Sequence, residues 1–89
     1  MSETRAIRLK RLRIRSWRRG MREMDMLLGP FSDGPLKDLS DRQLDTYEEL
    51  LSENDQEIYR WASGQAETPE QYQYLIGQVL ALSKASSSS

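Results

Sequence analysis

The 89-residue sequence contains neither cysteine nor histidine. Without cysteine there are no disulfides, thiolate metal ligands or cysteine nucleophiles, which fits a reducing compartment. Without histidine, Ser-His-Asp triads, imidazole acid–base chemistry and most zinc sites are excluded. Only carboxylates, lysines and hydroxyls remain for chemistry, so we expect a protein that is not an enzyme, with no catalytic residues and no metal site.

The sequence also has no apolar run near the ~20 residues that a membrane-spanning helix requires. Its N-terminus is basic but carries no hydrophobic segment of the secretory type. An arginine-rich, acid-poor start is also typical of mitochondrial transit peptides. Because the basic stretch continues unbroken into a glycine-centred motif, we expect a bacterial cytoplasmic protein rather than one of the mitochondrial matrix.

Charge is distributed unevenly along the chain, although the net charge is only −1. Residues 1–22 carry nine Lys or Arg and one acidic residue, whereas residues 23–89 carry four Lys or Arg and thirteen acidic residues. This asymmetry favours a basic face that meets an anionic partner. The acidic residues between positions 41 and 57 lack the spacing of a calcium loop, and we expect them to form a solvated face.

Helical periodicity and capping signals predict an all-α chain. Ser40 and Gln43 form a capping box, Asn54 is an N-cap, and Thr68 with Pro69 marks a third helix start. The pair Gly29-Pro30 predicts a bend or an end of the second helix. The five expected helices are roughly 4–18, 21–31, 40–52, 55–63 and 69–84.

These helices predict a compact five-helix bundle in a single small domain over residues 1–84. Residues 85–89, "ASSSS", are expected to form a disordered tail. Met21 and Met24 lie on the apolar stripe of the second helix, while Met26 points away from it and is expected to be exposed. Methionines of this kind can also line an adaptable binding surface.

The stretch "RSWRRGMREMD" places Gly20 between the first two helices, where it allows a left-handed turn and close approach of another backbone. Arg18 and Arg19 lie at a helix C-terminus, and Glu23 and Asp25 lie near the next N-terminus, as the helix dipole favours. A well-capped structural corner therefore explains the pattern. Four arginines within eight residues exceed what capping needs, and guanidinium groups suit carboxylates, phosphates and carbonyls of a partner. Both interpretations stay open on physical grounds.

The sequence "RRGMREMD" resembles the R-G-x-x-E-x-D signature of the succinate dehydrogenase assembly factors, the small flavinylation factors. The block from Trp17 to Phe31 is the most specific part, and similarity in element order extends over roughly residues 8–84. Arg19, Gly20 and Glu23 match the defining residues of the family, and Asp25 matches the usual acid two positions further on. Arg18 stands where many members carry histidine, which leaves the role of that histidine open here.

The resemblance implies a chaperone-like factor that binds the flavoprotein subunit of succinate dehydrogenase or fumarate reductase. It implies that FAD becomes covalently attached to a histidine of that partner and is not bound stably by this chain. A monomeric free state, no membrane contact and little nucleic-acid binding are expected. The expected partner-binding residues are Arg18, Arg19, Gly20, Arg22, Glu23 and Asp25, with an outward-facing Arg19 and Glu23 that grip the partner, close to Gly20.

The alternative function is a small helical nucleic-acid-binding or regulatory protein that uses the basic residues 5–22. Such a protein would be retained on DNA or RNA in a salt-sensitive manner. The acidic remainder of the chain argues against broad affinity for nucleic acid.

Overall fold

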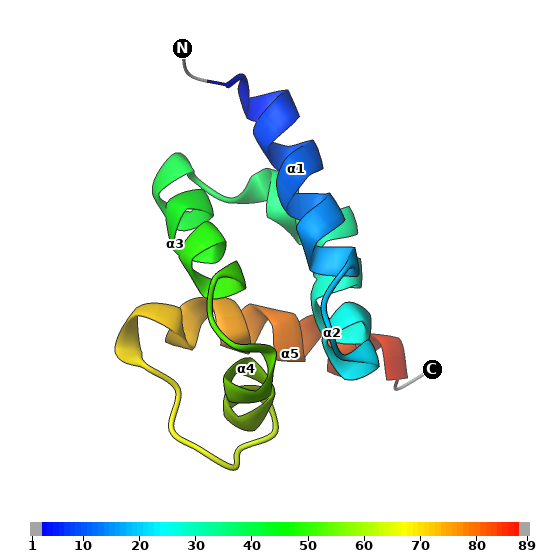
Figure 1. The fold of residues 1–89 in the computed structure, drawn as a ribbon, viewed down its shortest axis with the longest axis vertical. Coiled ribbons are helices and arrows are strands. Elements are labelled where there is room, and N and C mark those ends of the chain that lie inside the picture. Colours follow the sequence, from blue (N-terminus) through cyan, green and yellow to red (C-terminus); the bar gives the residue numbers. More distant parts are fainter. Residues whose placement is uncertain (1–2, 88–89) are drawn as a thin grey trace.

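The first two helices form an antiparallel hairpin, α1 (Arg5–Trp17) and α2 (Arg22–Asp33). A computed structural model describes residues 3–87 and is the structure used throughout. In Figure 1, α1 runs from the N-terminus toward the corner, and α2 returns beside it. A 3-10 turn, η1 (Pro35–Asp38), then leads across to α3 (Asp41–Leu51), which lies on the other side of α1.

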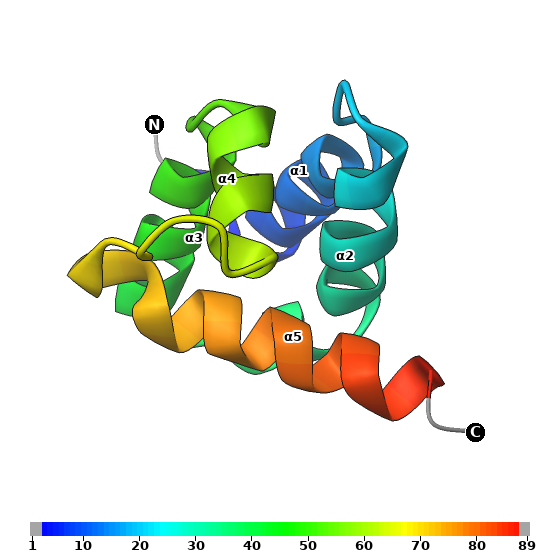
Figure 2. The same ribbon diagram turned by 90° about the horizontal axis from the view of Figure 1, so that it is seen from below.

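The second half of the chain closes the bundle from one end. The short helix α4 (Asp55–Ala62) follows α3, and the 3-10 turn η2 (Glu70–Tyr72) leads directly into α5 (Gln73–Ser87). Viewed from below in Figure 2, α5 extends along the molecule beneath α2, α3 and α4. Residues 3–87 form five α-helices and contain no strand, so the predicted all-α, five-helix bundle is confirmed.

The capping chemistry explains why two of these helices begin where they do. Ser40 and Gln43 form the predicted capping box at α3, and the Asn54 side chain accepts the Gln56 N–H at α4. Gly64, just beyond α4, adopts φ of 80°, a left-handed conformation that glycine permits at low cost. The start of the last helix differs from the prediction, since Thr68 makes no capping box and the chain enters α5 through η2.

The prediction that Gly29-Pro30 bends or ends the second helix is wrong as to an end, because α2 continues through Pro30 to Asp33. A proline inside a helix costs about 3 kcal/mol. The nearby residues Leu28 and Phe31 are 1% and 0% exposed, and burial of such a side chain contributes about 1.5–3 kcal/mol. Packing on both sides of the proline therefore offsets the local preference.

The core is one apolar cluster to which every α-helix contributes. Between α1 and α3, the buried Ser16 and Tyr47 hydroxyls share a hydrogen bond of 2.6 Å, and burial raises the pKa of Tyr47 to about 12. Met24 is fully buried and Met26 is 62% exposed, as expected. The fully or nearly fully buried apolar residues are Leu12, Met24, Leu28, Phe31, Leu36, Leu39, Leu44, Tyr47, Leu50, Leu51, Ile58, Tyr72, Leu75, Ile76 and Val79.

The expected boundary between domain and tail stays a prediction. Residues 85–87 lie at the end of α5, and residues 88 and 89 lie outside the described residues.

Candidate functional site

The corner between α1 and α2 consists of residues 18–21 and lies against the first turn of α4. Two hydrogen bonds fix its backbone. The Arg19 N–H donates to Asp25 Oδ1 at 2.8 Å, and the Gly20 N–H donates to Asp55 Oδ2 at 2.8 Å. Both acceptors carry a negative charge, and charge-assisted bonds of this kind are about twice as strong as neutral ones. The corner is therefore held in one shape by its own bundle.

The Arg19 side chain is the main connection between this corner and α4. Its Nε donates to Asp55 Oδ1 at 2.7 Å, and the guanidinium also reaches the main-chain oxygens of Leu51 and Glu53 at 2.8 and 3.4 Å. The side chains of Arg19 and Asp55 are only 10% and 17% exposed. Because the two carbonyls lie at the end of α3 and just beyond it, Arg19 joins the corner to both α3 and α4.

The expectation that Arg19 presents its guanidinium outward to a partner is wrong. Its charge is neutralised internally by Asp55, one of the acidic residues expected on a solvated face. Asp55 lies 36 positions from Arg19, and no short-range pattern pairs them. The position of Asp55 directly after the Asn54 cap marks a helix start, but it does not reveal which cation the carboxylate meets.

Gly20 is exposed. It does not adopt the left-handed conformation expected for it: within residues 3–87, Gly64 is the one glycine with positive φ. A Cβ added at Gly20 would lie 3.5 Å from Asp55 Oδ2, an ordinary contact. Close approach of a partner backbone at Gly20 stays a prediction; inside the described chain a tight glycine contact lies at Gly29, where an added Cβ would lie 2.5 Å from the Trp17 ring. Trp17 thus closes the α1–α2 hairpin over a glycine, and its indole N–H donates to Asp33 Oδ1 at 3.1 Å.

Three of the six predicted partner-binding residues present free charges beside this corner. Arg18, Arg22 and Glu23 are exposed, and within residues 3–87 none of their side chains forms an ion pair or hydrogen bond. Asp25 is half-buried and is occupied by the Arg19 N–H. The structure therefore divides the predicted set into outward charges, the exposed Gly20, and Arg19 with Asp25, which support the corner from within.

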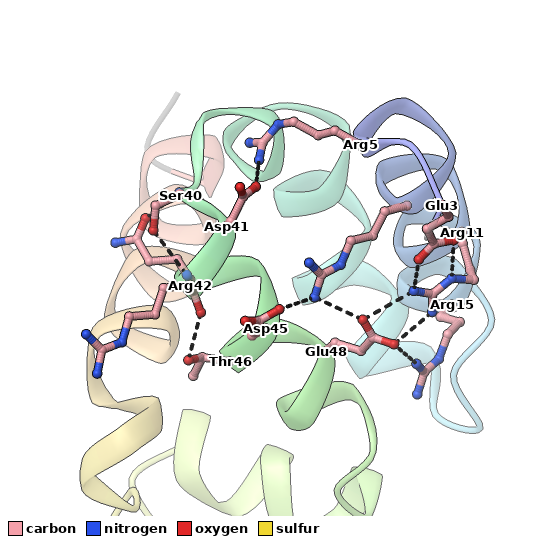
Figure 3. A network of polar contacts seen from close by, with 12 residues as sticks. Glu3, Arg5, Arg11, Arg15, Ser40, Asp41, Arg42, Asp45, Thr46 and Glu48 are labelled. Atoms are coloured by element: carbon pink, nitrogen blue, oxygen red, sulfur yellow. Dashed lines mark hydrogen bonds and ion pairs between the residues drawn. The ribbon is translucent and has the colours of Figure 1, made fainter. Parts of the chain in front are cut away.

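The basic face of α1 meets the acidic face of α3 in a network of ion pairs (Figure 3). Arg8 pairs with Asp45 at 2.6 Å, and Arg11 pairs with Glu48 at 2.9 Å. The hydrogen bond from Arg11 is the largest cause of the lowered pKa of Glu48. The other pairs in the network are Arg5 with Asp41, Arg8 with Glu48, Arg15 with Glu48 at 4.0 Å, and Arg11 with Glu3.

This network corrects the expectation that the acidic residues of α3 form only a solvated face. Asp41, Asp45 and Glu48 are the counter-charges of α1. Four of the eight arginines in the stretch that the nucleic-acid alternative requires, Arg5, Arg8, Arg11 and Arg15, are paired with carboxylates of α3, which weakens that alternative. The uneven distribution of charge along the sequence is thus explained in part by ion pairs between the basic helix α1 and the acidic helix α3.

An apolar groove lies beside the corner, between α2, α4 and α5, with a volume of ≈ 510 Å³. Neither local periodicity nor a motif indicates it, because its walls come from three helices that are distant in sequence. Met26, which points away from the buried stripe of α2, is the one sequence signal for it. The groove is lined by Glu23, Met26, Leu27, Pro30, Tyr59, Leu82 and Ser83.

Two further features bear on cofactors and membranes. In residues 3–87 no group of three or more acidic residues is arranged to hold a metal ion. Over the same part of the chain, no helix combines the length and apolar character needed to cross a bilayer.

Comparison with known proteins gives one consistent result. A family model described as flavinator of succinate dehydrogenase matches residues 10–82. A mitochondrial succinate dehydrogenase assembly factor 2-B of Drosophila mojavensis is 40% identical over 77 residues, 84% of this chain and 49% of the fly protein. The mitochondrial succinate dehydrogenase assembly factor 2 of Danio rerio is 41% identical over 80 residues, 88% of this chain and 49% of the fish protein. That of Meyerozyma guilliermondii is 48% identical over 61 residues, 68% of this chain and 45% of the yeast protein.

The chain spans about half the length of these relatives. Their names also correct one expectation: they are mitochondrial proteins, and they point to mitochondria rather than to a bacterial cytoplasm. The expectation of a bacterial cytoplasm rests on the basic N-terminal stretch, which runs unbroken into the motif. The ion pairs with α3 explain that continuity as part of the folded helix α1, so it carries no information about the compartment.

Proposed function

The chain belongs to the family of flavinators of succinate dehydrogenase, and from this membership we propose that it is an assembly factor for covalent flavinylation. In this proposal it binds the flavoprotein subunit of succinate dehydrogenase, and of fumarate reductase where that enzyme is present. The match over residues 10–82 is the observation that carries the proposal, since it includes the whole corner and all five α-helices in whole or in part.

The proposed action is binding rather than catalysis of a turnover reaction. A chain without histidine and cysteine lacks the side chains to which flavins are usually joined, so the covalent bond forms on the partner. FAD is then a substrate of the partner's own reaction, and this chain holds no stable cofactor. The free protein is proposed to be a monomer.

The geometry supports a binding role because it leaves unpaired charges on a rigid support. Arg18, Arg22 and Glu23 are exposed beside a corner whose shape is set by the Arg19–Asp55 contact. A preorganised surface loses little conformational entropy when a partner binds. We therefore assign direct contact to the exposed charges and a positioning role to Arg19, Asp25 and Asp55.

Reconstitution tests the function. The apo flavoprotein subunit of succinate dehydrogenase is incubated with FAD, with and without this chain, and covalent flavin is read as fluorescence of the denatured subunit. We expect the chain to increase covalent flavin, and Glu23→Gln to reduce that increase while Glu67→Gln, the same change at an exposed site elsewhere, preserves it. Equal fluorescence with and without the parent chain contradicts the proposed function.

A further inference from the structure

The apolar groove beside the corner has the dimensions and chemistry of a binding site. Its volume of ≈ 510 Å³ lies within the range of about 300–1,000 Å³ typical of ligand sites. The three helices that form it, α2, α4 and α5, lie around one region of the molecule in Figure 2. On its wall, the Met26 side chain is 62% exposed, although it is large and apolar. An exposed methionine is well suited to a partner surface because its flexible thioether adapts to different shapes.

The groove has one charged lining residue, the carboxylate of Glu23. Among residues 3–87, this carboxylate has no hydrogen-bond or ion-pair partner. Among the described residues the groove has no lysine or arginine in its lining, so its one carboxylate disfavours an anionic occupant such as the diphosphate of FAD. Apolar walls that include one free carboxylate instead complement an apolar group that is next to a cation.

We propose that this groove binds a segment of the flavoprotein subunit that carries one large aliphatic or aromatic side chain close to a lysine or arginine. The apolar side chain enters between Met26, Pro30 and Tyr59, and the cation pairs with Glu23. This inference rests on the proposed function and extends it, because it adds the faces of α4 and α5 to a contact otherwise limited to the motif.

Continuity with the corner argues for a polypeptide occupant rather than a small molecule. Glu23 belongs to both surfaces, since it lines the groove and lies in the first turn of α2, next to the exposed Arg22. A partner that contacts the exposed charges of the corner therefore lies directly beside the groove. Affinity in such interfaces is concentrated in a few apolar anchors surrounded by polar contacts.

A matched pair of arginine substitutions tests the groove. Met26→Arg introduces a charge into the groove, and Tyr74→Arg makes a comparable change at a 58% exposed residue of α5 that does not line it. Affinity for the apo flavoprotein subunit is measured by biolayer interferometry, and folding by far-ultraviolet circular dichroism. We expect Met26→Arg to weaken binding at least tenfold and Tyr74→Arg to stay within twofold. Unchanged binding by folded Met26→Arg, or equal weakening by both variants, overturns the proposal.

Photo-crosslinking identifies the occupant without depending on a destabilising substitution. Benzoylphenylalanine at position 26 is irradiated in the complex, and mass spectrometry locates the crosslinked partner peptide. The expected peptide has a large apolar residue within about one helical turn of a lysine or arginine. A crosslink to a segment without that combination, or no crosslink from a complex that forms, overturns the proposal.

Two further outcomes separate this inference from the proposed function. If equilibrium dialysis shows that the free chain binds FAD and that Met26→Arg abolishes this binding, the occupant is the flavin and the peptide proposal is wrong. If the parent chain promotes flavinylation and Met26→Arg does so equally well, the groove proposal fails and the function stands. If the parent chain neither binds the flavoprotein subunit nor promotes its flavinylation, both fail.

Discussion

Two groups of arginines in this chain have opposite environments. Four of the five arginines of α1 form a distributed ion-pair network with α3, in which the Arg11 side chain, for example, is 38% exposed. Arg19, at the corner, is 10% exposed and is held by one carboxylate and two carbonyls. Exposed pairs contribute about 0–1 kcal/mol each, whereas removal of one partner of a buried pair costs about 3–5 kcal/mol. Each ion pair between α1 and α3 therefore contributes little to stability. The single Arg19–Asp55 pair contributes much more, and it fixes the shape of the corner.

The largest effect is expected from Asp55→Ala. It leaves the mostly buried Arg19 charge without its carboxylate and the Gly20 N–H without its acceptor, so the free energy of unfolding should fall by about 2–4 kcal/mol. Urea denaturation measures the change, and binding of the flavoprotein subunit should weaken as well.

Glu57→Ala is the matched control, because Glu57 is a second acid in the first turn of α4 and forms only an exposed pair with Arg60. Equal losses from the two alanine variants would contradict the special role of the Arg19–Asp55 contact. A double-mutant cycle with Arg19→Ala should show strong coupling, since both changes remove the same interaction.

The next largest effect is expected at Gly29, where α2 packs against the Trp17 ring at the end of α1. Gly29→Ala places a Cβ 2.5 Å from the Trp17 ring, so the indole must move. Overpacking of this kind costs about 1–3 kcal/mol, although the helix propensity of alanine returns up to about 1 kcal/mol. Thermal unfolding measures the loss, and the emission of Trp17 should shift because its contact with α2 and Asp33 changes. An unchanged melting temperature and spectrum would show that this contact is not tight.

A smaller, salt-dependent effect is expected at Glu48. Glu48→Gln should lower stability by about 0.5–1 kcal/mol at low ionic strength, and the difference should diminish near 1 M salt. Its pKa is lowered from the ordinary value of 4.5 mainly by the hydrogen bond from Arg11, so its stabilising contribution is present above pH 4.5. That contribution is lost as the pH falls below 4.5 through the pKa of the folded state.

Denaturation of parent and variant across pH 2 to pH 7 tests both dependences, with the exposed neighbour Glu49→Gln as the control. The two stability curves should converge at the acidic end for Glu48→Gln. A constant difference at all salt concentrations and pH values would contradict an electrostatic origin.

The smallest effect on folding is expected at Gly20. Gly20→Ala adds a Cβ at an ordinary distance of 3.5 Å from Asp55 Oδ2, so stability should change by less than about 0.5 kcal/mol. Gly20→Arg should also fold, since the position is exposed, but it should bind the flavoprotein subunit more weakly. Retained binding by Gly20→Arg would place the interface elsewhere. A large stability loss in Gly20→Ala would contradict the ordinary 3.5 Å contact between the added Cβ and Asp55 Oδ2.

Local signals in the sequence predicted most of the fold. The Ser40–Gln43 capping box and the Asn54 cap lie at the helix starts they indicate, and the apolar stripes form the core. Pro30 misled the prediction because the burial of Phe31 outweighs a local preference. Considered alone, the α1 segment fits either a helix or a strand. In the structure it forms a helix, whose arginines pair with the acids of α3.

The candidate site was harder to predict because its organisation depends on long-range contacts. The motif identified the corner, but nothing near Arg19 in sequence shows that its charge is neutralised by Asp55. The same holds for the groove, whose lining residues Met26, Tyr59 and Leu82 come from three helices. Local patterns show which residues carry charge, and tertiary structure decides which charges remain available to a partner.

The Arg19–Asp55 contact joins positions that are 36 residues apart, and this separation has a consequence for synthesis. While the polypeptide leaves the ribosome, the motif emerges well before α4, so its signature residues exist for a time without the support that shapes them. A synthetic peptide of residues 15–25 would lack that support permanently. If the proposed function holds, the ability to bind the flavoprotein subunit arises only when α4 docks, and an isolated peptide with the signature residues is not expected to bind it.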